Sequence, residues 1–131
     1  MQKQYETYQQ NAVLTASPGE LTLMLYNGCI KFIHLAKRAI QEQDIEAKHL
    51  NITKSQNIIS ELIVTLNVDY EISHEMRRLY DYMNRRLIEA NIKNNEEILN
   101  EVEGLVTEFR DTWKEVILLN RKKQRISSGL V

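Results

Sequence analysis

Two pairs of glutamate and histidine have the spacing that helical proteins use to hold metal ions. Glu46 and His49 form one Glu-x-x-His pair, and Glu71 and His74 form the other. In di-iron carboxylate bundles, such pairs project inward from facing helices together with further glutamates. Whether a metal site can form here depends on which helix faces carry these residues.

The helical positions of the two pairs argue against a metal site. At about 100° per residue, Glu46 and His49 lie opposite the apolar seam that contains Ile52. Glu71 and His74 precede or open the next helix and point away from its apolar face. We therefore interpret all four side chains as exposed to solvent, and we predict no metal or other cofactor.

The remaining reactive side chains do not suggest catalysis. Cys29 is the single cysteine, which excludes an internal disulfide, and no histidine lies at helical spacing from it. His34 lies among basic residues on a polar face, where a histidine is usually a surface residue. The sequence has no glycine-rich phosphate loop. We predict that the protein is not an enzyme.

The charge pattern indicates neither nucleic-acid binding nor membrane insertion. The formal net charge is −1, so the chain has no overall basic field. The run from Arg121 to Arg125 is basic enough to contact RNA or acidic lipid, but it lacks interleaved aromatic residues, and we interpret it as a solvated helix end. Residues 21–33 are too polar to span a bilayer. Because the N-terminus has no apolar signal segment, we expect a cytoplasmic protein.

Long helices with short connections account for most of the chain. One proline and four glycines in 131 residues leave few breaks. Pro18 and Glu20 mark a helix start that should run to about residue 42. The expected capping residues of the four helices are Ser17, Asp44, Ser73 and Asn94 or Asn95. We predict an all-α fold, an antiparallel up-and-down four-helix bundle, with an N-terminal arm (1–16), the bundle (17–125) and a flexible tail (126–131).

The first predicted helix carries an unusually wide apolar surface. Its predicted core face, within about 60° of Leu21, consists of Leu21, Met24, Leu25, Gly28, Phe32, Leu35, Ala36 and Ala39. The apolar surface continues through Leu23, Tyr26, Cys29, Ile30, Ile33 and Ile40. The total arc of about 260° is more than twice the stripe that a surface helix needs. The bundle itself, the arm, or a helix of a partner protein are three ways to cover the additional surface.

Two sequence blocks resemble the flagellin-specific export chaperones of the FliS family. The first is VLTASPGEL at residues 13–21, followed by LMLYNG at residues 23–28; the second is LYDYMNRRLIEAN at residues 79–91. Trp113 also fits, and the likeness covers nearly the whole chain. The family often has aspartate where Asn27 stands and a small apolar residue where Cys29 stands. Neither difference weakens the resemblance.

The resemblance implies a cytoplasmic export chaperone. Such a protein binds the disordered C-terminal segment of flagellin, prevents premature polymerisation and delivers flagellin to the flagellar type III export apparatus. The implied partners are this segment, which becomes helical, and a component of the export gate. The N-terminal arm of such proteins can occupy the cargo surface in the empty state. An alternative is a structural homodimer or adaptor without flagellin cargo, and a cargo-free homodimer is compatible with either function.

The later helices have apolar core rows that we predict from helical spacing: Ile45, Ile52, Ile59, Leu62, Ile63 and Leu66 in the second; Met76, Leu79, Tyr80, Met83, Leu87 and Ala90 in the third; and Ile98, Leu99, Val102, Leu105, Val106, Phe109, Trp113, Val116 and Ile117 in the fourth.

We predict that flagellin contacts apolar residues beyond these predicted core rows. The predicted partner-binding residues are Tyr8, Val13, Leu23, Tyr26, Ile30, Ile33, Ile40, Tyr82, Ile88 and Ile92. For each of them, packing inside the protein is an equally good interpretation. Ordering a disordered segment consumes roughly 2–5 kcal/mol of interaction energy, so the contact surface should be extended and apolar.

Overall fold

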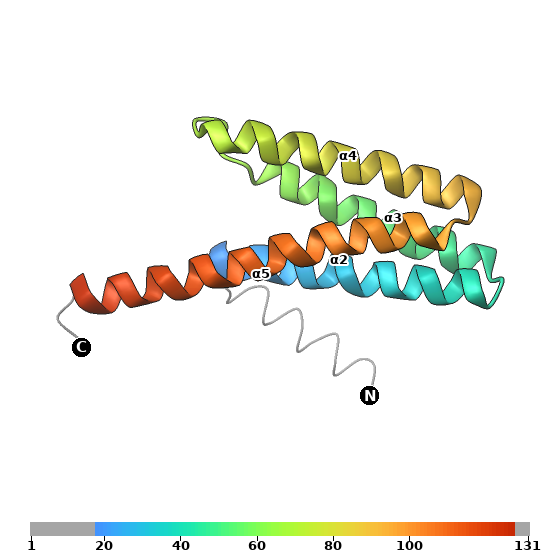
Figure 1. Cartoon of the computed structure of the whole chain (residues 1–131), viewed down its shortest axis with the longest axis horizontal. Coiled ribbons are helices and arrows are strands. Elements are labelled where there is room, and N and C mark those ends of the chain that lie inside the picture. Colours follow the sequence, from blue (N-terminus) through green and yellow to red (C-terminus); the bar gives the residue numbers. More distant parts are fainter. Residues whose placement is uncertain (1–17, 128–131) are drawn as a thin grey trace.

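A computed structural model describes residues 18–127, which form four α-helices joined by short connections (Figure 1). The helices are α2 (Pro18–Gln41), α3 (Ile45–Val64), α4 (Glu71–Lys93) and α5 (Glu96–Ser127). Successive helices run antiparallel; α2 packs against α3 and α5, and α4 packs against the same two helices. The predicted four-helix bundle is confirmed for this part of the chain. The arm with Tyr8 and Val13, the predicted cap Ser17 and residues 128–131 of the predicted tail lie outside the described residues. Residues 126 and 127, predicted as part of the flexible tail, belong to α5.

Polar side chains begin two of the helices as the sequence predicts. The Oδ1 atom of Asp44 accepts a hydrogen bond from the backbone N–H of Ala47 at 3.1 Å, which caps α3. Of the two candidate caps for α5, Asn95 is the one used. Its Oδ1 atom accepts from the backbone N–H groups of Glu97, at 2.9 Å, and Ile98, at 3.2 Å. These bonds satisfy backbone donors that have no partner within the helix.

Helix α4 begins earlier than predicted. Its N-cap residue is Tyr70, which makes no side-chain capping bond, and Ser73 is buried inside the helix. The prediction that Ser73 caps this helix is therefore wrong. The backbone N–H of Tyr70 donates to the carbonyl of Asn67 at 3.2 Å, and this tight turn brings the chain into helical geometry before Ser73.

The buried face of α2 lies about a quarter-turn from the predicted one. Tyr26, Cys29 and Ile33, which the sequence places beyond the core, expose 2%, 0% and 0% of their surface. Leu35, placed in the core, exposes 37%. Because α2 has two neighbours, its deepest line runs between α3 and α5 rather than along Leu21. The bundle itself thus covers much of the wide apolar arc.

Other predicted core positions lie at the surface. Ile45, Leu79 and Val116 are exposed. Ile45 is the first residue of α3, so no preceding helical turn covers it. In α4 the buried line runs through Tyr80 and Met83 instead of Leu79. The centre of the core is otherwise made of the predicted residues Ile52, Ile59, Leu62, Leu87, Ala90, Ile98, Leu99, Val102 and Val106.

Candidate binding groove at the open end of the bundle

The two ends of the bundle differ in shape. At one end the α2–α3 and α4–α5 turns lie side by side (Figure 1), and we call this the closed end. At the other end, the start of α2, the α3–α4 connection and the outgoing part of α5 surround a cavity of about 610 Å³. We call this the open end and its cavity the end groove. Its volume lies in the range of protein pockets that bind ligands, roughly 300–1,000 Å³.

The end groove is apolar with a polar margin. Its aliphatic and indole walls are Leu21, Leu25, Leu62, Leu66, Met76 and Trp113. Tyrosines and uncharged polar residues complete the lining: Thr22, Tyr26, Thr65, Asn67, Tyr70, Ser73, Tyr80 and Asn120. Among residues 18–127, no aspartate, glutamate, lysine or arginine lines it. An apolar centre inside a polar rim is the usual composition of a protein-binding surface.

Two buried tyrosines lie at the base of the groove. The hydroxyl oxygens of Tyr26 and Tyr80 are 2.6 Å apart, and either group can donate the hydrogen bond. The ring of Phe109 meets both tyrosines edge-on, with centroids 6.3 Å from Tyr26 and 5.6 Å from Tyr80. Burial raises the pKa of both phenols above the ordinary value. The base of the groove is therefore uncharged at neutral pH.

Trp113 joins one wall of the groove to the start of α2. Its indole Nε1–H donates to the backbone carbonyl of Gly19 at 2.8 Å, so α5 and α2 are fixed to each other at the open end. Trp113 is half-buried and is the single tryptophan of the chain. Its fluorescence is therefore a direct reporter of what enters the groove.

The side chains considered for catalysis do not form a reactive site. Burial raises the pKa of the Cys29 thiol to about 12, so the thiol is uncharged at neutral pH and is not a nucleophile. The predicted exposure of Glu46, His49, Glu71 and His74 is confirmed. Within the part of the chain that the structure describes, no three side chains of histidine, cysteine, aspartate or glutamate are grouped to hold a metal ion.

The predicted partner-binding residues of α2 are not brought together. Tyr26 lines the end groove, whereas Ile33 is enclosed in the core. Leu23 and Ile30 are half-buried. Ile40 lines a small cavity of about 110 Å³ near the closed end. The placement of Tyr26 and Ile33 outside the core is wrong, because α5 packs on the side of α2 that the sequence analysis left free.

The predicted partner-binding residues of α4 lie away from the end groove. Tyr82 is half-buried, and its hydroxyl donates to the Glu101 carboxylate of α5 at 2.8 Å. That carboxylate raises the pKa of the Tyr82 phenol, because ionisation would break the bond and create a like charge. Ile88 and Ile92 are exposed. They remain available for contact with a partner.

The residues that form the groove walls were predicted as core residues. Leu62, Leu66, Met76 and Trp113 belong to the expected apolar rows of their helices. The available signal is the difference in helix length: α5 has 32 residues, whereas α2, α3 and α4 have 24, 20 and 23. Where one helix continues past its neighbours, the last residues of the core rows have no layer above them.

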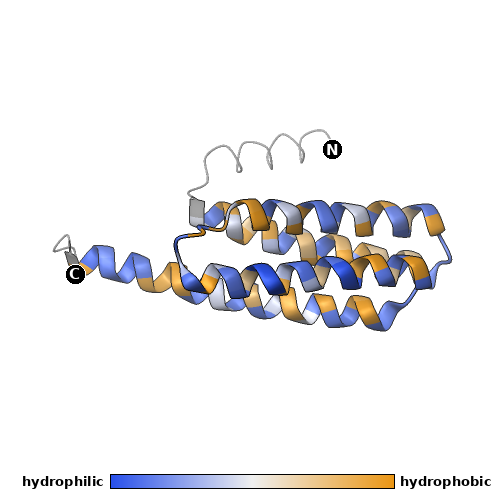
Figure 2. Ribbon diagram, turned by 90° about the horizontal axis from the view of Figure 1, so that it is seen from above, coloured by the Kyte–Doolittle hydropathy of each residue, from blue (hydrophilic) through white to orange (hydrophobic). Residues whose placement is uncertain are grey.

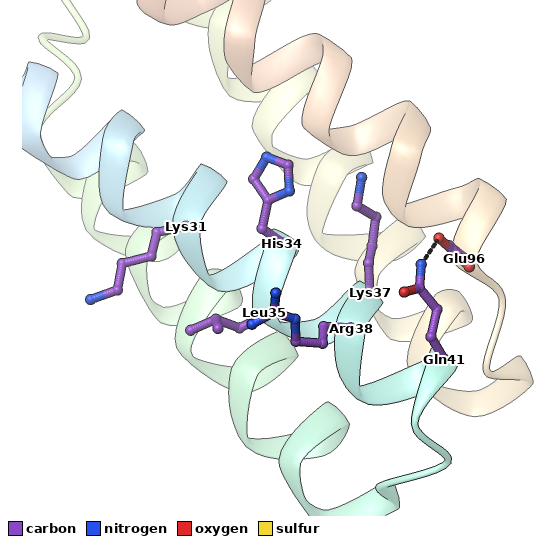
Figure 3. Close-up of a pocket in the computed structure, with 7 residues that line it drawn as sticks. All are labelled: Lys31, His34, Leu35, Lys37, Arg38, Gln41 and Glu96. Carbon is purple, nitrogen blue, oxygen red and sulfur yellow. Dashed lines mark hydrogen bonds between the residues drawn. The ribbon is translucent and has the colours of Figure 1, made fainter.

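Another hollow, of about 520 Å³, lies on the outer side of α2 and is lined mainly by polar and basic residues (Figure 3). Its positive groups do not converge on one point, since Lys31 points away from His34 and Lys37. The Lys37 ammonium is 2.8 Å from the Glu103 carboxylate, and Gln41 donates to Glu96 at 2.7 Å. The Lys37 ammonium and the Gln41 amide are thus already paired within the protein and are less available to a ligand. The end groove is therefore the better candidate for a binding site.

The fold and the groove define a helical bundle suited to binding an apolar segment of another chain. Over residues 1–120 the sequence matches the family described as flagellar protein FliS, and this chain belongs to that family. It is 57% identical over 130 residues to the flagellar secretion chaperone FliS of Bacillus subtilis (strain 168), covering 99% of this chain and 98% of that protein.

More distant relatives and a solved structure agree. The flagellar secretion chaperone FliS of Salmonella typhimurium (strain LT2) is 36% identical over 110 residues, which cover 82% of each chain. A crystal structure of a flagellar chaperone from bacteria superposes with a TM-score of 0.72 at 17% identity, covering 88% of this chain and 96% of that one. The latter likeness supports the bundle fold.

Proposed function

We propose that this protein is a cytoplasmic export chaperone for flagellin. It binds the disordered C-terminal segment of flagellin, prevents premature polymerisation and delivers flagellin to the flagellar type III export apparatus through a component of the export gate. Membership of a family whose relatives are named flagellar secretion chaperones supports this proposal. The structural observation that carries it is the uncharged, apolar end groove.

In this proposal the flagellin segment folds as it binds. An amphipathic helix presents apolar side chains at positions i, i+3, i+4 and i+7, and a groove between helices accepts such a row. The end groove alone is short, and ordering the segment consumes roughly 2–5 kcal/mol. Further apolar contact is therefore needed, and Leu23, Ile30, Ile88 and Ile92 are the residues that we propose extend the surface.

The proposal assigns the N-terminal arm to the same groove in the cargo-free protein. Gly19 lines the groove, so the chain that precedes it joins the bundle at the groove margin. Tyr8 and Val13 are the arm residues proposed to enter it. Deletion of residues 1–13 should then tighten flagellin binding, and unchanged or weaker binding would dismiss the competition.

Fluorescence of Trp113 provides the main test. Titration with a peptide of the flagellin C-terminal segment should shift the Trp113 emission to shorter wavelength as the indole loses contact with water. Leu66→Ser, at the groove wall, should weaken binding about 10-fold or more. Leu50→Ser is the control for the same substitution, because Leu50 lies on α3, just before the connection that contains Leu66, but is exposed and does not line the groove.

Three outcomes would contradict the proposed site. Equal changes of peptide affinity in Leu66→Ser and Leu50→Ser would show that the groove is not part of the binding surface. Absence of any fluorescence change with a peptide that nevertheless binds would place the cargo elsewhere. Light scattering that shows a dimer which the peptide does not dissociate, together with no peptide binding, would favour a structural homodimer.

A further inference from the structure

The C-terminal part of α5 projects beyond the other three helices. Both views show it continuing past the open end of the bundle (Figures 1 and 2). Ile117 packs near Gly19 of α2, and Arg121 forms an ion pair of 2.8 Å with Glu20 of α2. We define residues 114–126 as the overhang. These two contacts place α2 beside the first two turns of the overhang.

The overhang exposes large aliphatic side chains. Leu118, Leu119 and Ile126 expose 62%, 59% and 61% of their surface. Val116, Leu119 and Ile126 are spaced by three and seven residues, so they lie along one side of the helix. Figure 2 shows an apolar stretch of this projection next to the bundle and a hydrophilic stretch beyond it. A helix end that leaves such groups in water gains little stability from its own sequence, since most helix stability comes from packing.

Basic residues border the exposed aliphatic side. The overhang contains Lys114, Arg121, Lys122, Lys123 and Arg125, with Glu115 as its one acidic residue. Five of the 17 basic residues of a chain with net charge −1 are thus gathered in one projection. Lys122 and Lys123 are three and four residues after Leu119, so they lie beside it on the helix surface.

We propose that the overhang adsorbs to a bilayer of anionic phospholipid. Clusters of four to eight basic residues on an amphipathic helix favour anionic headgroups, and neighbouring aliphatic side chains enter the boundary between headgroups and acyl chains. The exposed residues here are aliphatic rather than aromatic, which suits lipid better than single-stranded nucleic acid. Two copies of so basic a surface repel each other. The contact is peripheral, because no helix within residues 18–127 is long and apolar enough to cross a membrane.

Vesicle co-sedimentation of the full chain tests this proposal. The protein should sediment with phosphatidylcholine vesicles that contain phosphatidylglycerol and not with phosphatidylcholine alone, and added salt should release it. Lys122→Gln with Lys123→Gln should weaken binding about 30-fold. Arg85→Gln with Lys93→Gln removes the same charge from α4 and should leave binding nearly unchanged. Leu119→Ser with Ile126→Ser should weaken binding about 10-fold. Circular dichroism of each variant should show the helical content of the parent.

Several results would overturn the proposal. One is equal sedimentation with both vesicle types. Another is an equal loss of vesicle binding in the Lys122 and Lys123 variant and in the Arg85 and Lys93 variant. The third is binding to polyuridylate without binding to vesicles. The flagellin-peptide titration of Trp113 separates this proposal from the chaperone function. Loss of peptide affinity in the Lys122 and Lys123 variant, with vesicle binding intact, would assign the overhang to the cargo surface instead.

Discussion

The two ends of the bundle differ: the closed end pairs its polar groups inside the protein, whereas the open end leaves apolar side chains exposed. At the closed end, Lys48 is buried, and its ammonium donates to the carbonyl of Asn91 at 2.7 Å and to the side-chain oxygen of Asn94. Asn94 ends α4 in the left-handed conformation (φ 52°), which asparagine tolerates better than most residues. At this end, the hydrogen bonds of the Lys48 ammonium therefore join α3 to α4.

The open end leaves apolar side chains exposed. Its α4 starts without a side-chain cap, and exposed apolar residues lie in the α3–α4 connection (Val68 and Tyr70) and at the helix ends beside it (Val64 and Ile72). The end groove lies beside this connection. We therefore expect substitutions at the closed end to change mainly stability and substitutions at the open end to change mainly the proposed binding.

The largest effect should come from the closed end. Lys48→Met keeps the aliphatic stem but removes the donor, which leaves the Asn91 carbonyl and the Asn94 amide oxygen without their ammonium partner. We expect a loss of about 3 kcal/mol in the free energy of unfolding. Urea unfolding measures it. Lys54→Met is the control: Lys54 is an exposed lysine on the same helix whose ammonium lies 5.1 Å from the centre of the Phe32 ring, so the change should be at most about 1 kcal/mol.

A substitution in the end groove should weaken peptide binding with little loss of stability. Met76 is half-buried at the open end, so Met76→Ala should cost less than about 1 kcal/mol of stability, well below the 2–5 kcal/mol of a fully buried position. Binding of the flagellin peptide should weaken about 10-fold. Parallel urea unfolding and Trp113 titration give both numbers. A stability loss as large as that of Lys48→Met would show that the two ends are not independent.

The ionisation of the Cys29 thiol tests whether water reaches the buried core. The folded thiol has a pKa of about 12, whereas an unfolded thiol has one of about 8.5. Above the lower value the unfolded chain releases a proton that the folded chain retains, so stability falls as pH rises. The thiol contributes up to about 1.4 kcal/mol per pH unit between these values.

The Cys29 prediction is checked by urea unfolding at pH values from about 8 to about 9, where unfolded tyrosines are still largely protonated. Cys29→Ala should show a shallower decline than the parent. Tyr26 and Tyr80 act in the same direction at higher pH, since burial raises the pKa of both. Identical slopes for parent and variant would mean that the thiol is hydrated in the folded protein.

The smallest effect should come from the uncapped start of α4. Tyr70 occupies the N-cap position with extended backbone (φ −93°, ψ 132°), a conformation that suits serine. Tyr70→Ser should therefore raise stability by about 1 kcal/mol. Because Tyr70 also lines the groove, the same change should weaken peptide binding. Thermal unfolding and the Trp113 titration test this; a loss of stability would show that the tyrosine ring packs usefully at this end.

Features that depend on local sequence could be predicted. The four helices, the caps Asp44 and Asn95 and the buried rows through Ile52 and Met83 follow from spacing and side-chain chemistry within a few residues. The prediction for Ser73 fails because Asn67 closes a turn that starts the helix early: its carbonyl accepts from the Tyr70 N–H, and its side-chain Oδ1 accepts from the Asp69 N–H at 3.0 Å. Fold class was therefore more accessible than exact boundaries.

The candidate site was harder to predict because it is not a local property. The buried line of α2 depends on which two helices flank it, and this decides that Ile33 is enclosed while Leu35 reaches the surface. The end groove arises from the greater length of α5 relative to its neighbours, so Leu66 and Met76 change from expected core to groove wall. Residue patterns along one helix contain neither fact.

The hydrogen bond between Tyr26 and Tyr80 limits how the groove can adapt. It connects α2 to α4, which lie diagonally across the bundle, each packed on α3 and α5. Prising these two helices apart would leave two buried hydroxyls without partners, at a cost of about 1–3 kcal/mol for each. This hydrogen bond therefore holds the depth of the cavity constant. Under the proposed function, we expect this fixed depth to select cargo side chains by their length.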